Sequence, residues 1–186
     1  MASQPTLPLL TRALHDAGEI IARTTPDQAG LPTPCSEFDV HALVNHTVFD
    51  LRRFRQMIGG PDAGSPEADL IASDWKGAYD AAAQDLLAQW QQRGGQGSMQ
   101  LGRLGEMPVS WAIGQHLADI ACHGWDVARA TGQQSEGDPE VGEVALAWAR
   151  QSLKPEYRGQ AFGAEVTVPD SAPLYDRLAG FFGRTP

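Results

Sequence analysis

The chain has 186 residues, 42% of them hydrophobic and 20% charged, so it can bury one compact core and is not disordered by composition. Its 23 acidic residues outnumber 14 basic ones and give a formal net charge of −9, which argues against a nonspecific nucleic-acid or anionic-membrane binder. No apolar run is long enough to cross a bilayer, and the first ten residues lack the pattern of a secretory signal. We therefore expect one cytoplasmic domain over residues 1–186, with no nucleic-acid or membrane partner.

Clusters of Pro and Gly divide the first half of the chain into three segments with helical spacing of apolar residues. The first covers about Leu7 to Ala22. The second begins at Asp39, a plausible N-cap residue, and runs to Ile58. The third is predicted to begin at Ser65-Pro66-Glu67, with Pro at the first helical position, and to continue to Gly94.

The second half is also mainly helical. Residues 96–109 mix Gly and Pro with short apolar residues, which predicts an irregular stretch or a weak hairpin. Helices are predicted from Ser110 to Thr131, from Pro139 to Leu153 and from Ser171 to Phe182, with a short strand at 164–169. Because helices dominate and the loops are short, we predict an all-α fold, namely an up-and-down four-helix bundle with a short extra helix and minor β or irregular segments.

The helix predicted from Ser110 to Thr131 carries a strip of polar side chains. At about 100° per residue, imidazole and carboxylate groups fall on one line beside the apolar face: His116, Asp119, His123 and Asp126. Asp119 and His123 are four residues apart, a spacing at which two side chains can share a ligand. A carboxylate with a neutral imidazole suits a divalent ion such as Zn²⁺ or Ni²⁺.

A third ligand would have to come from another helix, and the second helix offers two histidines. His46 lies about 60° from Leu43, at the edge of the core stripe, where it can point into a groove between helices. His41 lies about 140° from His46 and cannot easily share that direction. From these residues alone, the polar strip is better explained as an interhelical hydrogen-bond network in a metal-free protein.

The two cysteines do not form a disulfide framework. Cys122 points about 100° away from His123, which indicates a small buried side chain rather than a ligand or nucleophile. Cys35 lies in a Pro-Cys-Ser-Glu loop, where no basic neighbour in the sequence would activate it.

Three segments carry motifs that occur in a characteristic order. They are Thr33-Pro34-Cys35-Ser36-Glu37-Phe38-Asp39-Val40 leading to Val44-Asn45-His46, then Gly105-Glu106-Met107-Pro108 with Asp119-x-x-x-His123-Gly124-Trp125-Asp126 continuing to Gly132, and finally Phe162-Gly163-Ala164-Glu165-Val166 with Val168-Pro169-Asp170. Together they resemble the DinB/YfiT-like superfamily, and in particular the N-terminal domain of actinobacterial mycothiol-dependent maleylpyruvate isomerases. The His-Gly-Trp-Asp block is the most specific part.

The resemblance implies a four-helix bundle whose groove holds a divalent metal, with His46, Asp119 and His123 at the ligand positions. Related enzymes use the metal to bind the thiolate of a low-molecular-weight thiol such as mycothiol, which then adds to a substrate for isomerisation or S-transfer. The isomerases usually carry Glu where this chain has Asp119, so the helix must sit closer or a water must bridge. They also have a second, C-terminal domain that this sequence lacks, so we do not expect isomerisation of maleylpyruvate itself.

We therefore predict a metal-dependent thiol transferase, monomeric or homodimeric, that uses Zn²⁺ or Ni²⁺, a small-molecule thiol and an electrophilic substrate. His116 and Asp126 are candidates to orient His123 or relay a proton. Arg52 and Arg53, in a basic run with Arg55, are candidates to contact an anionic thiol or substrate, although a solvated helix face is the commoner reason for such a run. The alternatives are a non-catalytic, stress-linked metal-binding module and a metal-free helical interaction protein.

Overall fold

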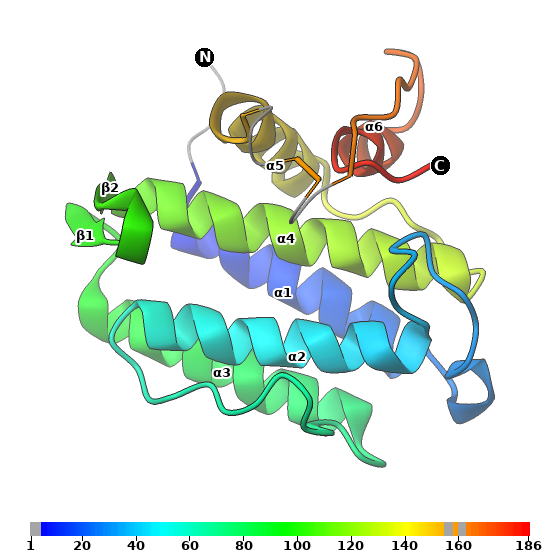
Figure 1. Ribbon diagram of the computed structural model, residues 1–186, viewed down its shortest axis with the longest axis horizontal. Coiled ribbons are helices and arrows are strands. Elements are labelled where there is room, and N and C mark those ends of the chain that lie inside the picture. Colours follow the sequence, from blue (N-terminus) through cyan, green and yellow to red (C-terminus); the bar gives the residue numbers. More distant parts are fainter. Residues whose placement is uncertain (1–4, 155–157, 160–162) are drawn as a thin grey trace.

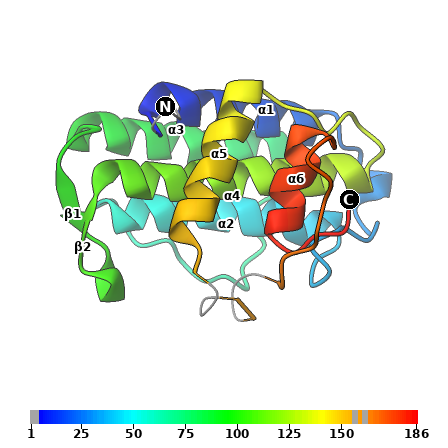
Figure 2. The ribbon, with the colours of Figure 1, turned by 90° about the horizontal axis from the view of Figure 1, so that it is seen from above.

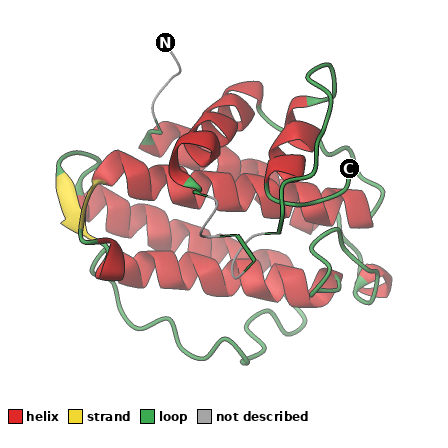
Figure 3. Ribbon diagram, turned by 45° about the horizontal axis from the view of Figure 1, so that its top comes forward, coloured by secondary structure: helices red, strands yellow, loops and turns green. Residues whose placement is uncertain are grey.

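The computed structural model describes residues 5–154, 158–159 and 163–186 (Figure 1). Helices dominate it, and its small sheet lies at one end (Figure 3). The central bundle consists of α1 (Leu7–Ala22), α2 (Val40–Met57), α3 (Trp75–Arg93) and α4 (Val109–Ala130). Helices α1 and α2 each contact both α3 and α4, so the four helices enclose one core. The predicted all-α bundle is therefore confirmed.

The connection from α2 to α3 crosses the length of the bundle, so that these two helices run in the same direction (Figure 1). The up-and-down order predicted from short loops therefore does not hold between them, because this connection is long. The helix predicted to begin at Ser65 begins instead at Trp75. The reason is tertiary: Asn45 on α2 accepts the Leu70 N–H at 2.7 Å and donates to the Ala68 carbonyl at 3.0 Å, which holds the connection in a non-helical conformation. Asp74 then caps α3 by accepting the N–H of Gly77.

A short hairpin leads into α4. Strands β1 (Ser98–Gln100) and β2 (Glu106–Pro108) pair antiparallel around the 3₁₀ turn η2 (Gly102–Leu104), as one of the two predictions for this stretch had it. Helix α4 follows β2 directly and begins at Val109, one residue before the predicted start. A second 3₁₀ turn, η1 (Pro26–Gln28), lies between α1 and α2.

Two further helices pack outside the bundle. Helix α5 (Pro139–Ser152) contacts α4 and α1, and α6 (Leu174–Phe181) contacts α5 and α4, so both cross over α4 (Figure 2). The indole N–H of Trp125 on α4 donates to Asp176 on α6 at 2.9 Å and fixes that docking. None of the described helices is long and apolar enough to cross a membrane.

The strand predicted at 164–169 is wrong, because these residues pair with no other strand among those described. Instead, the Val166 N–H donates to the Gly180 carbonyl at 2.9 Å, and the Val168 side chain fills the space that a Cβ on Gly180 would occupy. The segment therefore lies along α6. Phe162, which begins the third sequence motif, is outside the described residues.

Candidate metal site

A cavity of about 370 Å³ lies between α2 and α4, bordered by the loop before α2, by α5 and by the residues after α6. It brings together the three residues predicted as metal ligands, since His46, Asp119 and His123 all line it. The described residues that line it are Cys35, Glu37, Phe38, His46, Asp50, Arg53, Gln115, Asp119, Cys122, His123, Trp148, Phe182 and Arg184.

His123 is held by carboxylates on two sides of its ring. Its Nδ1 lies 3.2 Å from Asp126 Oδ2, and its Nε2 lies 3.8 Å from Asp119 Oδ1. Burial alone would lower the pKa of His123, but the hydrogen bond with Asp126 and the charges of both carboxylates outweigh it and raise that pKa. With Nδ1 donating to Asp126, Nε2 keeps its lone pair on the side of Asp119, as in the carboxylate–histidine pairs that orient metal ligands.

His46 approaches His123 from α2. The two imidazoles lie 5.3 Å apart, centroid to centroid, and stand nearly perpendicular at 83°. Phe38 stacks on a face of His46 at 4.8 Å, centroid to centroid, and limits rotation of the ring. The sequence predicted His46 at the edge of the core stripe of α2, and in the bundle that edge faces α4.

Asp50 is a residue of this cavity that the sequence reasoning missed. It is buried on α2, where His46 Nε2 lies 3.0 Å from Asp50 Oδ2 and Arg53 Nη2 lies 3.1 Å from Asp50 Oδ1. Burial favours the neutral acid, but the hydrogen bond and charge of His46, with Arg53, lower the pKa of Asp50 below its usual value. One ligand atom each from His46, Asp50 and His123 lie within 4.8 Å of one another. The sequence did contain a signal for Asp50, because it follows His46 by four residues, the same spacing as between Asp119 and His123.

Asp119 keeps 23% of its side chain exposed, and its nearest charged partner is the Nε2 of His123. Its pKa is raised, first by burial and then by the negative charge of Asp50, against the lowering effects of His123, His46 and Arg53. The negative charge of Asp50 beside Asp119 is a setting that a divalent cation would relieve.

Arg184 is the second residue that sequence reasoning missed, and it closes the site from the far end of the chain. Just after α6, Gly183 adopts a φ of +88°. The Gly183 N–H donates to the Gly180 carbonyl, and the Arg184 N–H donates to the Ala179 carbonyl. This glycine-dependent helix end turns the chain back toward α4. There the Arg184 guanidinium binds Asp126, with Nη2 3.0 Å and Nε 3.3 Å from Oδ2, and Nε 3.2 Å from Oδ1.

Cys35 lies on the Asp126 side of the cavity. One ligand atom each from Cys35, His123 and Asp126 lie within 4.8 Å of one another, a second set that shares His123 with the first. Burial raises the pKa of the Cys35 thiol to about 11, although the charge of Arg184 opposes that shift. Without a metal, Cys35 is therefore a thiol at neutral pH. Cys122 is buried, as predicted.

Two other candidates lie outside this cavity lining. His116 is fully buried, stacked on Phe54 at 3.9 Å, and its Nδ1 accepts the indole N–H of Trp90 at 3.4 Å, so it packs in the core apart from His123. Arg52 does not line the cavity, whereas Arg53 does. His41, which was not expected to share the direction of His46, faces Asp69 at 3.9 Å and borders a neighbouring cavity.

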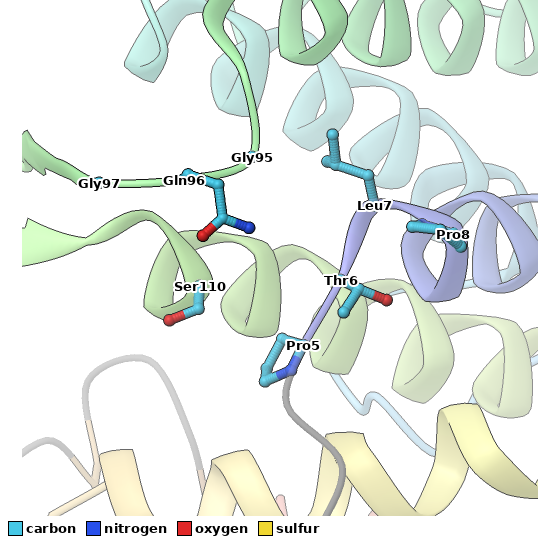
Figure 4. A pocket seen from close by; sticks show the side chains of 8 residues that line it. All are labelled: Pro5, Thr6, Leu7, Pro8, Gly95, Gln96, Gly97 and Ser110. Carbon is cyan, nitrogen blue, oxygen red and sulfur yellow. The ribbon is translucent and has the colours of Figure 1, made fainter.

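A further cavity of about 310 Å³ lies between the start of α1 and the turn before β1 (Figure 4). It is lined by Pro5, Thr6, Leu7, Pro8, Gly95, Gln96, Gly97 and Ser110. None of these described residues carries a titratable side chain, so this cavity offers no comparable donor set for a metal.

Comparison with known proteins places these features in a family context. The family model for the mycothiol maleylpyruvate isomerase N-terminal domain matches residues 10–128, which include α2 and most of α4. Two uncharacterized proteins of Mycobacterium tuberculosis, from strains CDC 1551 and H37Rv, are each 34% identical over 176 residues, or 94% of both chains. No solved structure matches the chain.

Proposed function

Because the chain belongs to the mycothiol maleylpyruvate isomerase N-terminal domain family, we propose that its α2–α4 cavity binds a divalent metal ion and a low-molecular-weight thiol of the mycothiol type. The observation that carries the proposal is the convergence of two histidines from different helices beside Asp50, with His46, Asp50 and His123 donor atoms within 4.8 Å of one another. Imidazole and carboxylate donors suit Zn²⁺ and Ni²⁺.

The donor set is also supported by charge. Among the described lining residues there are three carboxylates and two guanidinium groups, an excess of one negative charge that favours a cation. His46 and His123 would supply nitrogen ligands and Asp119 an oxygen ligand. Asp50 already pairs with both His46 and Arg53, so its role is to hold the α2 side of the site in place.

The remaining wall fits a small organic molecule. Phe38, Trp148 and Phe182 give the cavity an apolar side, and the half-exposed guanidinium of Arg53 lies at its edge. A bound divalent ion would supply the positive charge that favours a thiolate over a thiol at neutral pH. Arg53 would attract an anionic group of the thiol or of its electrophile.

The reaction class that this arrangement supports is S-transfer. The thiol sulfur loses its proton and forms a bond to an electrophilic carbon. Either a leaving group such as chloride departs and the proton passes to solvent, or an epoxide ring opens and its oxygen takes up the proton. His46 and His123 position the site in which the sulfur is held, and the aromatic wall keeps water from competing for the electrophile.

A second candidate function is that of a metal-free helical interaction protein. It is favoured by the fact that both histidines already have carboxylate partners, His46 with Asp50 at 3.0 Å and His123 with Asp126 at 3.2 Å. Such a network can fix the register of packed helices without any ion. Between these two lies a third function, that of a module that binds a metal ion but catalyses no S-transfer.

The decisive experiment measures metal content in protein purified without a metal-binding tag, using elemental mass spectrometry. We expect about one divalent ion per chain in the wild type and loss of that ion in His46→Ala and His123→Ala. His41→Ala is the matched control, since it removes a histidine of the same helix that does not line the cavity. Unchanged metal content in His123→Ala contradicts the ligand assignment, and a wild type that takes up no metal favours the interaction protein.

Turnover is then tested with mycothiol and 1-chloro-2,4-dinitrobenzene. The metal-loaded wild type should release the thioether and chloride, and the His123→Ala protein should not. A metal-loaded wild type without turnover would indicate a binding module.

A further inference from the structure

Two overlapping sets of metal-binding groups share His123. The first contains His46 and Asp50, and the second contains Cys35 and Asp126. Asp126 lies on the Nδ1 side of the His123 ring, whereas Asp119 lies on the Nε2 side. One imidazole therefore stands between a site of nitrogen and oxygen donors and a site that includes a thiol.

The second set has the chemistry of a good site for zinc. Cysteine, histidine and aspartate together make a soft, anionic donor set, and thiolate binds Zn²⁺ more strongly than a carboxylate does. The proposed ligand set of His46, Asp119 and His123 would have to compete with it for the same ion.

Arg184 blocks the second set of metal-binding groups. Its guanidinium uses both oxygens of Asp126, and its charge acts on Cys35 strongly enough to oppose the effect of burial on that thiol. A divalent cation placed between Cys35 and Asp126 would meet a fixed positive charge and would have to displace hydrogen bonds of 3.0 to 3.3 Å.

We propose that Arg184 selects the side of His123 that receives a metal ion, because it occupies Asp126 and places a positive charge beside Cys35. The thiol-containing set is thereby closed and the ion is directed toward His46. The inference rests on the proposed function, since it assumes a metal at His123. It gives Arg184 a role as a positioning residue, and it keeps an internal thiolate from taking the place of the external thiol.

The test uses Co²⁺ as the metal, in metal-free protein kept reduced without any thiol. Thiolate ligation of Co²⁺ gives a strong charge-transfer absorption in the near ultraviolet, which nitrogen and oxygen ligands do not give. We expect no such absorption in the wild type, its appearance in Arg184→Gln, and its loss again in the double variant Arg184→Gln with Cys35→Ser.

Two controls separate this role from a structural one. Arg184→Lys keeps the positive charge and should keep the wild-type spectrum. Arg158→Gln removes another largely buried arginine of the same region, one that bonds the Gly163 and Phe181 carbonyls rather than Asp126, and should also leave the spectrum unchanged. Helical circular dichroism verifies that each variant is folded, and Arg184→Met replaces Arg184→Gln if the latter unfolds.

Each outcome decides the matter. A Co²⁺ complex of Arg184→Gln without thiolate absorption overturns the proposal, and so does a Cys35-dependent absorption already present in the wild type. If the wild type binds no Co²⁺, the proposed metal site fails. The selecting role of Arg184 would still be supported if Arg184→Gln then gained a Cys35-dependent site, and would fail with the metal site if it gained none.

Discussion

Arg184 and Asp126 lie 58 residues apart in the sequence and meet through three hydrogen bonds, the shortest at 3.0 Å. Asp126 is completely buried, and Arg184 exposes 11% of its side chain. The same Asp126 carboxylate is hydrogen-bonded to Nδ1 of His123. The orientation of a proposed metal ligand on α4 therefore depends on a residue that follows α6.

Removing both partners of this buried pair should cost less free energy of unfolding than the two separate losses added together. Because a buried charge is left without its counter-charge, we expect Arg184→Gln or Asp126→Asn each to lower the free energy of unfolding by about 3 kcal/mol. The double variant should lose clearly less than the sum of the two. Urea denaturation of the metal-free proteins measures all three values.

The exposed Asp27 provides the control for this cycle, since Asp27→Asn should change stability by less than about 0.5 kcal/mol. Additive losses in the double variant would mean that the two side chains contribute independently, contrary to their contact.

The carboxylates on the two helices should differ in their effect on metal affinity. Among the described residues, Asp119 pairs with His123 alone, whereas Asp50 is held by His46 and Arg53. We expect Asp50→Asn to weaken Zn²⁺ binding by about 10-fold to 100-fold, as for groups that orient ligands, and Asp119→Asn to weaken it more. Competition titration with a chromophoric chelator gives both affinities. The reverse order would make Asp50 the oxygen ligand instead.

Sequence periodicity was sufficient for relationships within one helix. Asp119, His123 and Asp126 were expected on one strip of α4, and the structure places Asp119 and Asp126 on either side of His123 because a regular helix fixes the angles between them. The same reasoning would have found Asp50 had it been applied to α2. His46 was placed correctly at the edge of the core for the same reason.

Contacts between distant segments could not be predicted in this way. The Asn45 side chain holds the backbone at Ala68 and Leu70, and so delays α3 beyond the helix start that Ser65 suggested. Arg184 reaches Asp126 only because α6 docks on α4, a packing that no local pattern encodes. His116 lies on the polar strip by angle alone, but Phe54 and Trp90 enclose it in the core.

His116 should make the protein sensitive to acid. Burial, and then the charge of Arg53, lower its pKa to about 3, against about 6.5 in the unfolded chain. Between these values the unfolded state binds a proton that the folded state does not, so stability falls as the pH drops below about 6.5, by up to about 1.4 kcal/mol per pH unit. Thermal or urea unfolding from pH 7 to pH 4.5 measures this slope.

Comparison with His116→Gln isolates this contribution from that of the acidic residues. The variant should show a shallower loss of stability on acidification, while His15→Gln, which changes an exposed histidine of α1, should follow the wild type. An identical acid slope in His116→Gln would show that the proton is taken up elsewhere.

Gly183 should be required both for stability and for the position of Arg184. Its φ of +88° is unfavourable for any residue with a Cβ, and a Cβ there would lie 2.7 Å from the Cα of Gly163. The backbone conformation alone costs about 1 to 2 kcal/mol in Gly183→Ala, and relief of the clash must shift the turn that carries Arg184.

Gly30→Ala is the matched control, because nothing lies within 4 Å of its Cβ position. If Arg184 selects the metal side of His123, Gly183→Ala should therefore be less stable and also acquire part of the Cys35-dependent Co²⁺ absorption, whereas Gly30→Ala should change neither. A Gly183→Ala protein that is destabilised but keeps the wild-type spectrum would show that Arg184 holds Asp126 without help from the helix end.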